Sequence, residues 1–510
     1  MKNYRYVIAV AFLLSTLPLL LASSCTSTIN QPQGPALQLY YNSEEQPSEK
    51  SAVAQVLQSQ LSQKGIPVTL DPVSNTVFNE RLTKGDFEST LALWYLDYDD
   101  PEGFLTDFYS KAGFRMSKYD NPEYDRLYLD GLYAPQEATK IQKFRDAAAI
   151  LARDLPWIPL YSNNEIFLLR PAAKGFRSNA YQYYDYRGVT ANELRVSSDV
   201  EVQTLDPALA YDLASKHLVT QSYEGLVAMD ENSKLVPALA ETWTVSPNSD
   251  QLTFQLRKGV HYHGGDGHEV TSADVKASFE RMLKAHSPYS YILDNVDGVE
   301  DFKSGKATDV KGLLAPDKYT FVIKLTKPNP VMLHWLLAPA AYVLPKGLPV
   351  DYDFSKGSVG TGPFILQSWD GATARFKANQ SYWMTDQSGA KLSLPASLSI
   401  RVIKDVTAAL TAFRQGDLDI LNVPLALFSQ VFDNEGNLRD EWKQYEYREV
   451  KLNNLKMLVF NMQRDSQGLD LRRRQAIAAA IDRQAIVQQL FKGKARPATS
   501  IIPSGMPGFE

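Results

Sequence analysis

Residues 91–104 read LALWYLDYDDPEGF, and this stretch is the strongest local signal for the fold. Its first three residues alternate leucine and alanine, and Trp94 and Tyr95 extend a run that favours a β-strand. The run ends at the sequence DYDDP (97–101), because three carboxylates and a proline cannot continue a central strand. The pattern predicts a buried strand that delivers aromatic rings and carboxylates to its exposed end.

Two interpretations of this strand end remain open on the residues alone. Aromatic faces beside a carboxylate suit a ligand that carries a cation and an apolar body. A turn whose acidic side chains are simply solvated explains the same residues without any ligand. The motifs elsewhere in the chain favour the first interpretation.

The length and composition of the chain limit the number of domains and the class of protein. With 510 residues the chain is long enough for two or three domains or lobes. Hydrophobic residues make up 44% and charged residues 22%, as in an ordinary globular protein. The formal net charge is −5. A mildly acidic chain without a basic tract argues against nucleic acid as a partner.

The first 24 residues have the features of an export signal. Lys2 and Arg5 give a basic start, and the apolar run 7–21 is short for a membrane span and is broken by a proline. The sequence LASSC follows at 21–25, and Cys25 is the single cysteine of the chain.

This arrangement resembles the lipobox of bacterial lipoproteins, although Ala22 stands where such motifs usually have leucine. We therefore expect a signal peptide over residues 1–24, lipid attachment at Cys25 and a flexible, polar tether over residues 25–36. An ordinary signal peptide cut nearby is the alternative. The resemblance implies an exported protein that is anchored to a membrane and faces the periplasm or the cell exterior.

Hydrophobic periodicity indicates an α/β protein. Residues 37–41 and 66–70 alternate as strands, and residues 52–61 between them have helical spacing. A strand–helix–strand unit implies a sheet covered by helices. Further helices are expected over 135–153, over 273–283 after a Thr271 or Ser272 cap, and over 471–490.

A series of short motifs runs through residues 194–510. They are LDP (205–207), YEGL (223–226), AETW (240–243), FQLRKGV (254–260), TSADV (271–275), GTGPF (360–364), and RQAI with AIDR (474–483). Their order closely resembles the first two-thirds of the extracellular solute-binding proteins of family 5, which serve the import of dipeptides, oligopeptides and nickel. One departure is the loop GGDG (264–267), where the family has a shorter acidic turn.

Residues 37–189 resemble the final third of the same family. The motifs here are WYLDYDDP (94–101), YDNPEYD (119–125), DLPWIPLY (154–161) and KGF (174–176). The order is inverted, because the family's end stands before its beginning. We interpret this as a circular permutation, which costs little where the chain ends of a compact fold lie close together. A truncated or misassembled reading frame is the alternative.

The resemblance implies an α/β, two-lobed periplasmic-binding-protein-like fold of class II type with an extra subdomain, here circularly permuted. Residues 37–190 would correspond to the C-terminal third of the family, and residues 191–510 to its N-terminal two-thirds. The implied protein is the substrate-binding lipoprotein of an ABC importer, which captures peptides between the lobes and delivers them to membrane permease subunits. It would be a monomer and not an enzyme, and would need no cofactor or metal.

The resemblance also implies a ligand site at the end of the strand. Asp97 matches the family's carboxylate that takes the α-ammonium group of a bound peptide, and Trp94 stands beside it. Tyr95 and Tyr98 are expected to line the same site. In a closed cleft such a charge pair is strong, because both charges are desolvated together and hydrogen-bonded.

The glycine-rich connection between the lobes is expected to contribute Gly360, Thr361 and Gly362. Its expected roles are a hinge and contacts to the ligand backbone. Two glycines that allow a tight turn explain the same sequence without a ligand.

Other sites are less well supported. His261, His263 and His268 have short spacing that suits zinc or nickel, but strand alternation explains the first two without a metal. The aspartates at 97–100 crowd one turn, whereas a glycosidase needs an opposed pair. The sequence has no Gly-x-Ser-x-Gly elbow and no Walker phosphate loop. The alternatives left open are a secreted hydrolase, a permuted scaffold without transport, and a binding protein for nickel chelates, haem, opines or sugars.

Overall fold

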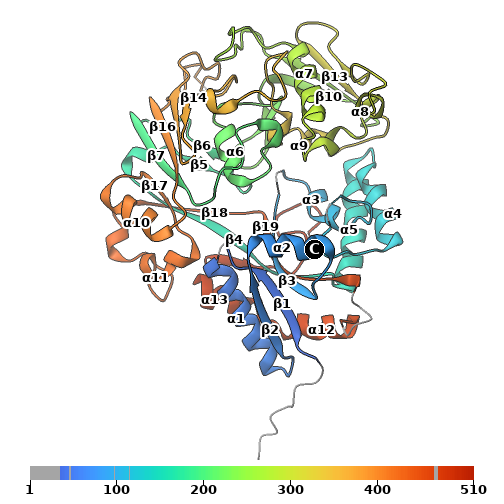
Figure 1. Ribbon diagram of the computed structural model, residues 1–510, viewed down its shortest axis with the longest axis vertical. Coiled ribbons are helices and arrows are strands. Elements are labelled where there is room, and N and C mark those ends of the chain that lie inside the picture. Colours follow the sequence, from blue (N-terminus) through green and yellow to red (C-terminus); the bar gives the residue numbers. More distant parts are fainter. Residues whose placement is uncertain are drawn as a thin grey trace, which may run out of the picture.

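The structure is a computed structural model. It describes residues 35–44, 47–96, 98–113, 115–386, 388–463 and 469–509. Figure 1 shows an α/β protein with a lower and an upper lobe, joined in the middle by long strands. The lower lobe contains the first elements of the described chain as well as the last.

One mixed sheet organises the lower lobe. Its strands are β1 (Leu37–Asn42), β2 (Val68–Val73), β3 (Ser89–Tyr95), β4 (Trp157–Leu169), β17 (Ile420–Asn422), β18 (Glu446–Lys451), β19 (Asn454–Phe460) and β20 (Ala495–Pro497). The order is β17-β4-β19-β3-β1-β2, and β18 and β20 also pair with β4. β19 lies antiparallel between β3 and β4, and all of its residues are buried. The first and the last strands of the described chain therefore belong to one sheet.

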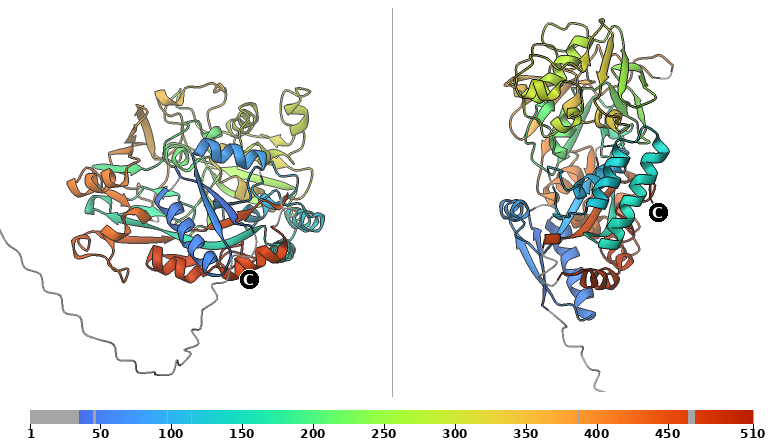
Figure 2. Two further views of the ribbon diagram at one scale, coloured as in Figure 1. Left: turned by 60° about the horizontal axis from the view of Figure 1, so that its bottom comes forward. Right: turned by 90° about the vertical axis from the view of Figure 1, so that its right-hand side faces the viewer.

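Helices cover both faces of this sheet (Figures 1 and 2). They are α1 (Pro47–Gln63), α2 (Asn75–Lys84), α3 (Glu102–Leu105), α4 (Pro122–Leu132), α5 (Glu137–Asp154), α12 (Leu471–Ala480) and α13 (Arg483–Phe491). α1 contacts α12 and α13 on one face, and α4 packs against α5 on the other. The single helix expected over 471–490 is wrong, because the side chain of Asp482 accepts a hydrogen bond from the amide of Ala485 and caps a second helix.

Two sheets build the upper lobe. The first has the order β14-β15-β16-β7 and the second, in the extra subdomain, β10-β11-β13-β12. Their strands are β7 (Glu193–Ser198), β14 (Phe364–Trp369), β15 (Thr373–Ala378), β16 (Ser397–Val402), β10 (Ala240–Val245), β11 (Gln251–Leu256), β12 (Leu313–Leu314) and β13 (Thr320–Lys324). In β15 buried and exposed residues alternate, as expected for a sheet with one face on the core.

Short elements complete the upper lobe and the middle of the molecule. They are β5 (Arg177–Ser178), β6 (Tyr184–Asp185), β8 (Val227–Met229), β9 (Leu235–Pro237), α6 (Leu213–Val219), α7 (Ser272–Lys284), α8 (Val299–Lys303), α9 (Met332–Trp335), α10 (Val406–Gln415) and α11 (Phe428–Val431). Thr271 and Asp274 form a capping box at the start of α7, which confirms the helix and cap expected there.

The long strand β4 links the lobes. Its first half pairs with β19 in the lower lobe, and its second half pairs with β17 and β18. Phe167 and Leu169 near its end pack into the hydrophobic cluster beneath the first upper sheet. β4 and the neighbouring run from β18 into β19 are therefore the chain segments that cross between the lobes.

No helix in the described part of the chain combines the length and the apolar composition that a membrane crossing requires.

Candidate functional site

The end of β3 lies where the two lobes meet. The Nε1 of Trp94 donates a hydrogen bond to the carbonyl oxygen of Gly103 at 2.6 Å, which folds the acidic turn back over the strand. Tyr95 is the last residue of β3, and 39% of its surface is exposed. A half-buried tryptophan and an exposed tyrosine therefore border this turn, as the sequence predicts.

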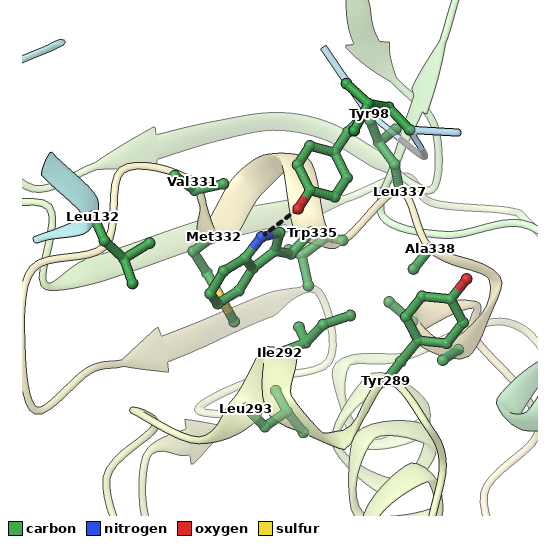
Figure 3. Packing of buried hydrophobic residues seen from close by; sticks show 14 of the residues in the cluster. Tyr98, Leu132, Tyr289, Ile292, Leu293, Val331, Met332, Trp335, Leu337 and Ala338 are labelled. Atoms are coloured by element: carbon green, nitrogen blue, oxygen red, sulfur yellow. Dashed lines mark hydrogen bonds between the residues drawn. The ribbon is translucent and has the colours of Figure 1, made fainter. Parts of the chain in front are cut away.

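Tyr98 connects the turn to the upper lobe. Its hydroxyl donates to the carboxylate of Glu102 at 2.7 Å and accepts from the Nε1 of Trp335 at 3.1 Å (Figure 3). Trp335 belongs to α9, so the hydrogen bond joins the lobes directly. Burial, followed by the charge of Glu102, raises the pKa of Tyr98 well above its usual value. The Tyr98 hydroxyl thus takes part in the contact between the lobes. A contact of Tyr98 with a ligand stays a prediction.

The acidic side chains of the turn have different surroundings. Asp100 and Glu102 are buried, so the interpretation of the three aspartates as simply solvated is wrong for Asp100. Asp100 pairs with the buried ammonium group of Lys140 at 2.5 Å. The half-buried Asp99 accepts a hydrogen bond from the hydroxyl of Tyr181 at 2.7 Å.

Asp97, the residue predicted to bind an ammonium group, lies outside the described residues. The same holds for Cys25, the predicted lipidation site. Both assignments stay predictions.

The glycine-rich connection at 360–362 is a site of close backbone approach. A Cβ atom on Gly360 would lie 2.0 Å from the carbonyl oxygen of Ser222, and one on Gly362 would lie 2.6 Å from the carbonyl carbon of Ser222. Neither glycine has a positive φ, so close packing rather than a left-handed turn explains why glycine stands here. The hydroxyl of Thr361 donates to the carboxylate of Glu224 at 2.8 Å. Contacts of these three residues with a ligand stay predictions.

Sequence reasoning missed a pocket beside this connection. Its volume is about 320 Å³, which is within the range of small-ligand sites. Residues from the β5–β6 hairpin, from the end of α6 through β9, and from the segment around Tyr382 line it. The YEGL motif at 223–226 was a signal for this region, whereas the hairpin residues 177–185 belong to none of the motifs named above.

Glu224 holds the inner wall of this pocket together. Its carboxylate accepts from the hydroxyls of Thr361 and Tyr382 at 2.8 and 2.7 Å and from the Nε1 of Trp383 at 2.8 Å. Burial raises the pKa of Glu224. With three donors on one carboxylate, this residue is a structural acceptor.

Two arginines and one carboxylate form the polar end of the pocket. Asp185 accepts from the Nε of Arg187 at 2.8 Å and from the Nη2 of Arg177 at 2.8 Å. Burial alone would raise the pKa of Asp185, but the guanidinium groups of Arg187 and Arg177 hold it below its usual value. Glu231 also lines the pocket and lies 3.7 Å from the Nε of Arg177, so the two guanidinium groups face two carboxylates. We refer to Arg177, Asp185 and Arg187 as the arginine cluster.

The three histidines do not come together. The Nδ1 of His261 is hydrogen-bonded to the carbonyl oxygen of Gly267. The Nε2 of the buried His263 is hydrogen-bonded to the carbonyl oxygen of Ser222. His268 lies between the carboxylates of Asp266 and Asp274. No group of histidine, cysteine, aspartate and glutamate in the described part of the chain has the arrangement of a metal site.

A family model described as "Bacterial extracellular solute-binding proteins, family 5 Middle" matches residues 26–115 and 234–510. The chain is 28% identical over 327 residues to the dipeptide-binding protein DppE of Bacillus subtilis, across 61% of this chain and 56% of the relative. It is 26% identical over 368 residues to the oligopeptide-binding protein OppA of the same species, across 68% of this chain and 63% of the relative.

Among solved structures, the Haemophilus influenzae OppA complex with the peptide RPPGFSPFR matches with a TM-score of 0.42 and 24% identity. That match covers 47% of this chain and 48% of the other. The chain thus spans about half to two-thirds of the length of the proteins it resembles.

Proposed function

The chain belongs to the bacterial extracellular solute-binding proteins of family 5, and we propose that it captures a peptide between its two lobes for delivery to the permease of an ABC importer. The observation that carries this proposal is the end of β3. There Trp94 and Tyr95 border an acidic turn whose Tyr98 contacts Trp335 in the other lobe. A ligand bound at this place would touch both lobes. The similarity to dipeptide- and oligopeptide-binding proteins supports a peptide as the solute.

The proposed anchor of the peptide is Asp97, which would accept the α-ammonium group. Its neighbours in sequence suit that role, because Trp94 and Tyr95 offer aromatic surface to the adjoining apolar part of the peptide. Gly360, Thr361 and Gly362 would approach the peptide backbone from the upper lobe.

Closure of the two lobes would exclude water from the ligand. The segments that cross between them are β4 and the run from β18 into β19. Such crossing segments are where hinge rotation is absorbed. Binding of a ligand by both lobes would favour the closed arrangement, since only that arrangement offers both sets of contacts.

We also propose that the order of the chain is a circular permutation of the family order. The pairing of β19 with β3 and β4 supports this, because it builds one sheet from segments that lie more than 280 residues apart in sequence. We further propose lipid attachment at Cys25, which would keep the exported protein at the membrane, as a monomer, beside its permease.

Native mass spectrometry of the purified protein tests the function. The expected result is a bound peptide, which is released on denaturation and is not cleaved during incubation. Release of a cleaved product would favour a secreted hydrolase instead. Retention of a chelate, haem, opine or sugar would replace the peptide with that solute.

A further inference from the structure

We propose that His334 is a proton-sensitive switch between the two lobes, and that its protonation favours opening of the lobes and release of the solute. This inference rests on the proposed function, because it adds regulation to the closure of the same lobes. His334 belongs to α9 and precedes Trp335, whose Nε1 donates to the hydroxyl of Tyr98 in the other lobe.

The helix α9 lies against the lower lobe, and we call this arrangement closed. Besides its hydrogen bond to Tyr98, the Nε1 of Trp335 approaches the carboxylate of Glu102 at 3.4 Å. Leu132 of α4, together with Val331 and Met332 at the start of α9, belongs to one hydrophobic cluster that extends through both lobes (Figure 3). Opening of the lobes at this contact would expose side chains of α9 to water.

One nitrogen of the His334 ring is shielded from water in the closed arrangement. The residue is half-buried, and its Nδ1 atom is buried without a hydrogen-bond partner among the described residues. A neutral imidazole can keep this nitrogen as an unprotonated acceptor. Protonation would place an N–H donor there, and a buried donor without an acceptor is costly, the more so when it carries charge. The geometry of the closed arrangement therefore favours the neutral ring.

The charged groups that face His334 come from the other lobe. α5 contributes Glu137 and Lys140, and the turn after β3 contributes Asp99 and Asp100. The ammonium group of Lys140 opposes a second cation, whereas the carboxylates favour one. Asp100 and Glu137 already lie 2.5 and 2.9 Å from the Lys140 nitrogen, and Asp99 accepts from a tyrosine hydroxyl. Burial has the largest effect, and it lowers the pKa of the His334 imidazole below its usual value.

The direction of the pH effect follows from the difference between the two arrangements. In the open arrangement His334 would face water, and its pKa would return towards the ordinary histidine value of about 6.5. The open arrangement therefore binds a proton more tightly than the closed one. Closure keeps its full strength well above this pKa and weakens as the pH falls through about 6.5 and below. A single proton gives at most about a tenfold loss of solute affinity one pH unit below that pKa.

The test measures peptide affinity by calorimetric titration at pH 7.5 and pH 5.5 for wild type and His334→Asn. Asparagine places an amide near the Nδ1 position and has no proton that titrates in this range. On acidification wild type should lose roughly three- to tenfold in affinity relative to the variant. The comparison cancels the titration of the peptide and of Glu102, since both proteins share them. Burial raises the pKa of Glu102, so its effect on closure has the opposite sign.

The matched control is His286→Asn. His286 is exposed and follows the C-terminal end of α7. Its φ of 51° is one that asparagine tolerates, so the change keeps the backbone and removes a histidine that does not belong to α9. This variant should show the pH dependence of wild type. Thermal unfolding of each variant checks that the fold is intact.

Small-angle X-ray scattering of the same proteins gives a readout that needs no added peptide. The radius of gyration of wild type should increase between pH 7.5 and pH 5.5, and that of His334→Asn should increase less. If peptides bind and both proteins lose affinity by the same factor on acidification, the inference is wrong while peptide capture stands. If no peptide binds, the proposed function fails and the scattering decides, and an equal change in both proteins or no change in wild type overturns the switch.

Discussion

The ammonium nitrogen of Lys140 lies 2.5 Å from the Oδ2 of Asp100, and both side chains are almost completely buried. Lys140 is in α5, and Asp100 is in the turn after β3. The exposed Glu137 approaches the same ammonium group at 2.9 Å. This ion pair fixes the acidic turn against the helix layer of its own lobe.

Removing one partner of this pair should destabilise the protein strongly. Lys140→Met leaves the Asp100 carboxylate buried without its cation, which costs about 3–5 kcal/mol. Urea unfolding measures the loss. The double variant Lys140→Met with Asp100→Leu should recover much of it. The control is Lys143→Met on the same helix, whose side chain is 32% exposed and which should change stability by less than about 1 kcal/mol. Equal losses for Lys140 and Lys143 would contradict the interpretation.

Glu165 on β4 should make stability depend on pH. Its carboxyl group accepts from the side chains of Tyr184, Gln182 and Asn422, and burial raises its pKa to about 7. The native state thus holds a proton that the unfolded chain loses near pH 4.5. The stabilisation is fully present below that pH and is lost as the pH rises towards 7.

The measurement is the free energy of unfolding of wild type and Glu165→Gln between pH 4.5 and 8. The wild type should lose up to about 3 kcal/mol relative to the variant over this interval. Taking the difference between the two proteins cancels the titration of all other groups. A difference that does not change with pH would show that Glu165 titrates normally.

Asp97→Asn should abolish useful peptide binding without lowering the melting temperature of the unliganded protein. Loss of one partner of a desolvated charge pair costs roughly 2–5 kcal/mol, which is about 30-fold to several thousandfold in affinity. N-acetylated peptides, which lack the cation, should bind wild type about as poorly. Calorimetric titration with a peptide pool provides the measurement.

The control for this experiment is Asp99→Asn. An amide oxygen at position 99 can still accept from the hydroxyl of Tyr181, so the local structure is kept and binding should change much less. If free and acetylated peptides bind alike, Asp97 is not the ammonium site and the peptide assignment loses its main support.

Cys25→Ser should release the protein from the membrane fraction of its host. One fatty chain gives only marginal membrane binding, and stable anchoring takes more than one, which the modification of bacterial lipoproteins supplies. Fractionation and mass spectrometry of the mature N-terminus provide the readout. A wild-type protein that is released without lipid and begins at another residue would show that the lipobox assignment is wrong.

Gly360→Ala should destabilise the upper lobe. The new methyl group would lie 2.0 Å from the carbonyl oxygen of Ser222, and overpacking of this kind costs roughly 1–3 kcal/mol. Gly113→Ala is the matched control, since no atom lies within 4 Å of its Cβ position. Chemical denaturation of both variants measures the difference, and a Gly360 variant as stable as the Gly113 variant would contradict the close approach.

The end of β3 is a feature that local sequence predicts. Alternation of apolar residues up to Tyr95, followed by a proline and several carboxylates, predicts where the strand ends. The cap of α7 at Thr271 was predictable for the same reason, because a side chain and the backbone amide three residues later are neighbours whatever the rest of the chain does. These features depend on contacts within a few residues.

The surroundings of the candidate site depend on contacts of another kind. Glu224 and Thr361 are 137 residues apart, Ser162 and Asn454 are 292 apart, and Lys140 and Asp100 are 40 apart. Local periodicity does not predict which distant residue becomes the partner of a given side chain. The burial of Asp100 beside Lys140 could therefore not be predicted, and a solvated turn explained the same residues.

By itself the sequence determined the class of fold, the strand that ends at the candidate site, and the motifs that mark the family. The tertiary structure alone decided that Asp100 is a buried ion pair, that Gly360 is a point of backbone contact, and that Arg177 and Arg187 share one carboxylate beside a pocket. The physical reason is that burial and charge pairing are set by the partners that the folded chain brings together, and those partners are chosen by packing over the whole lobe.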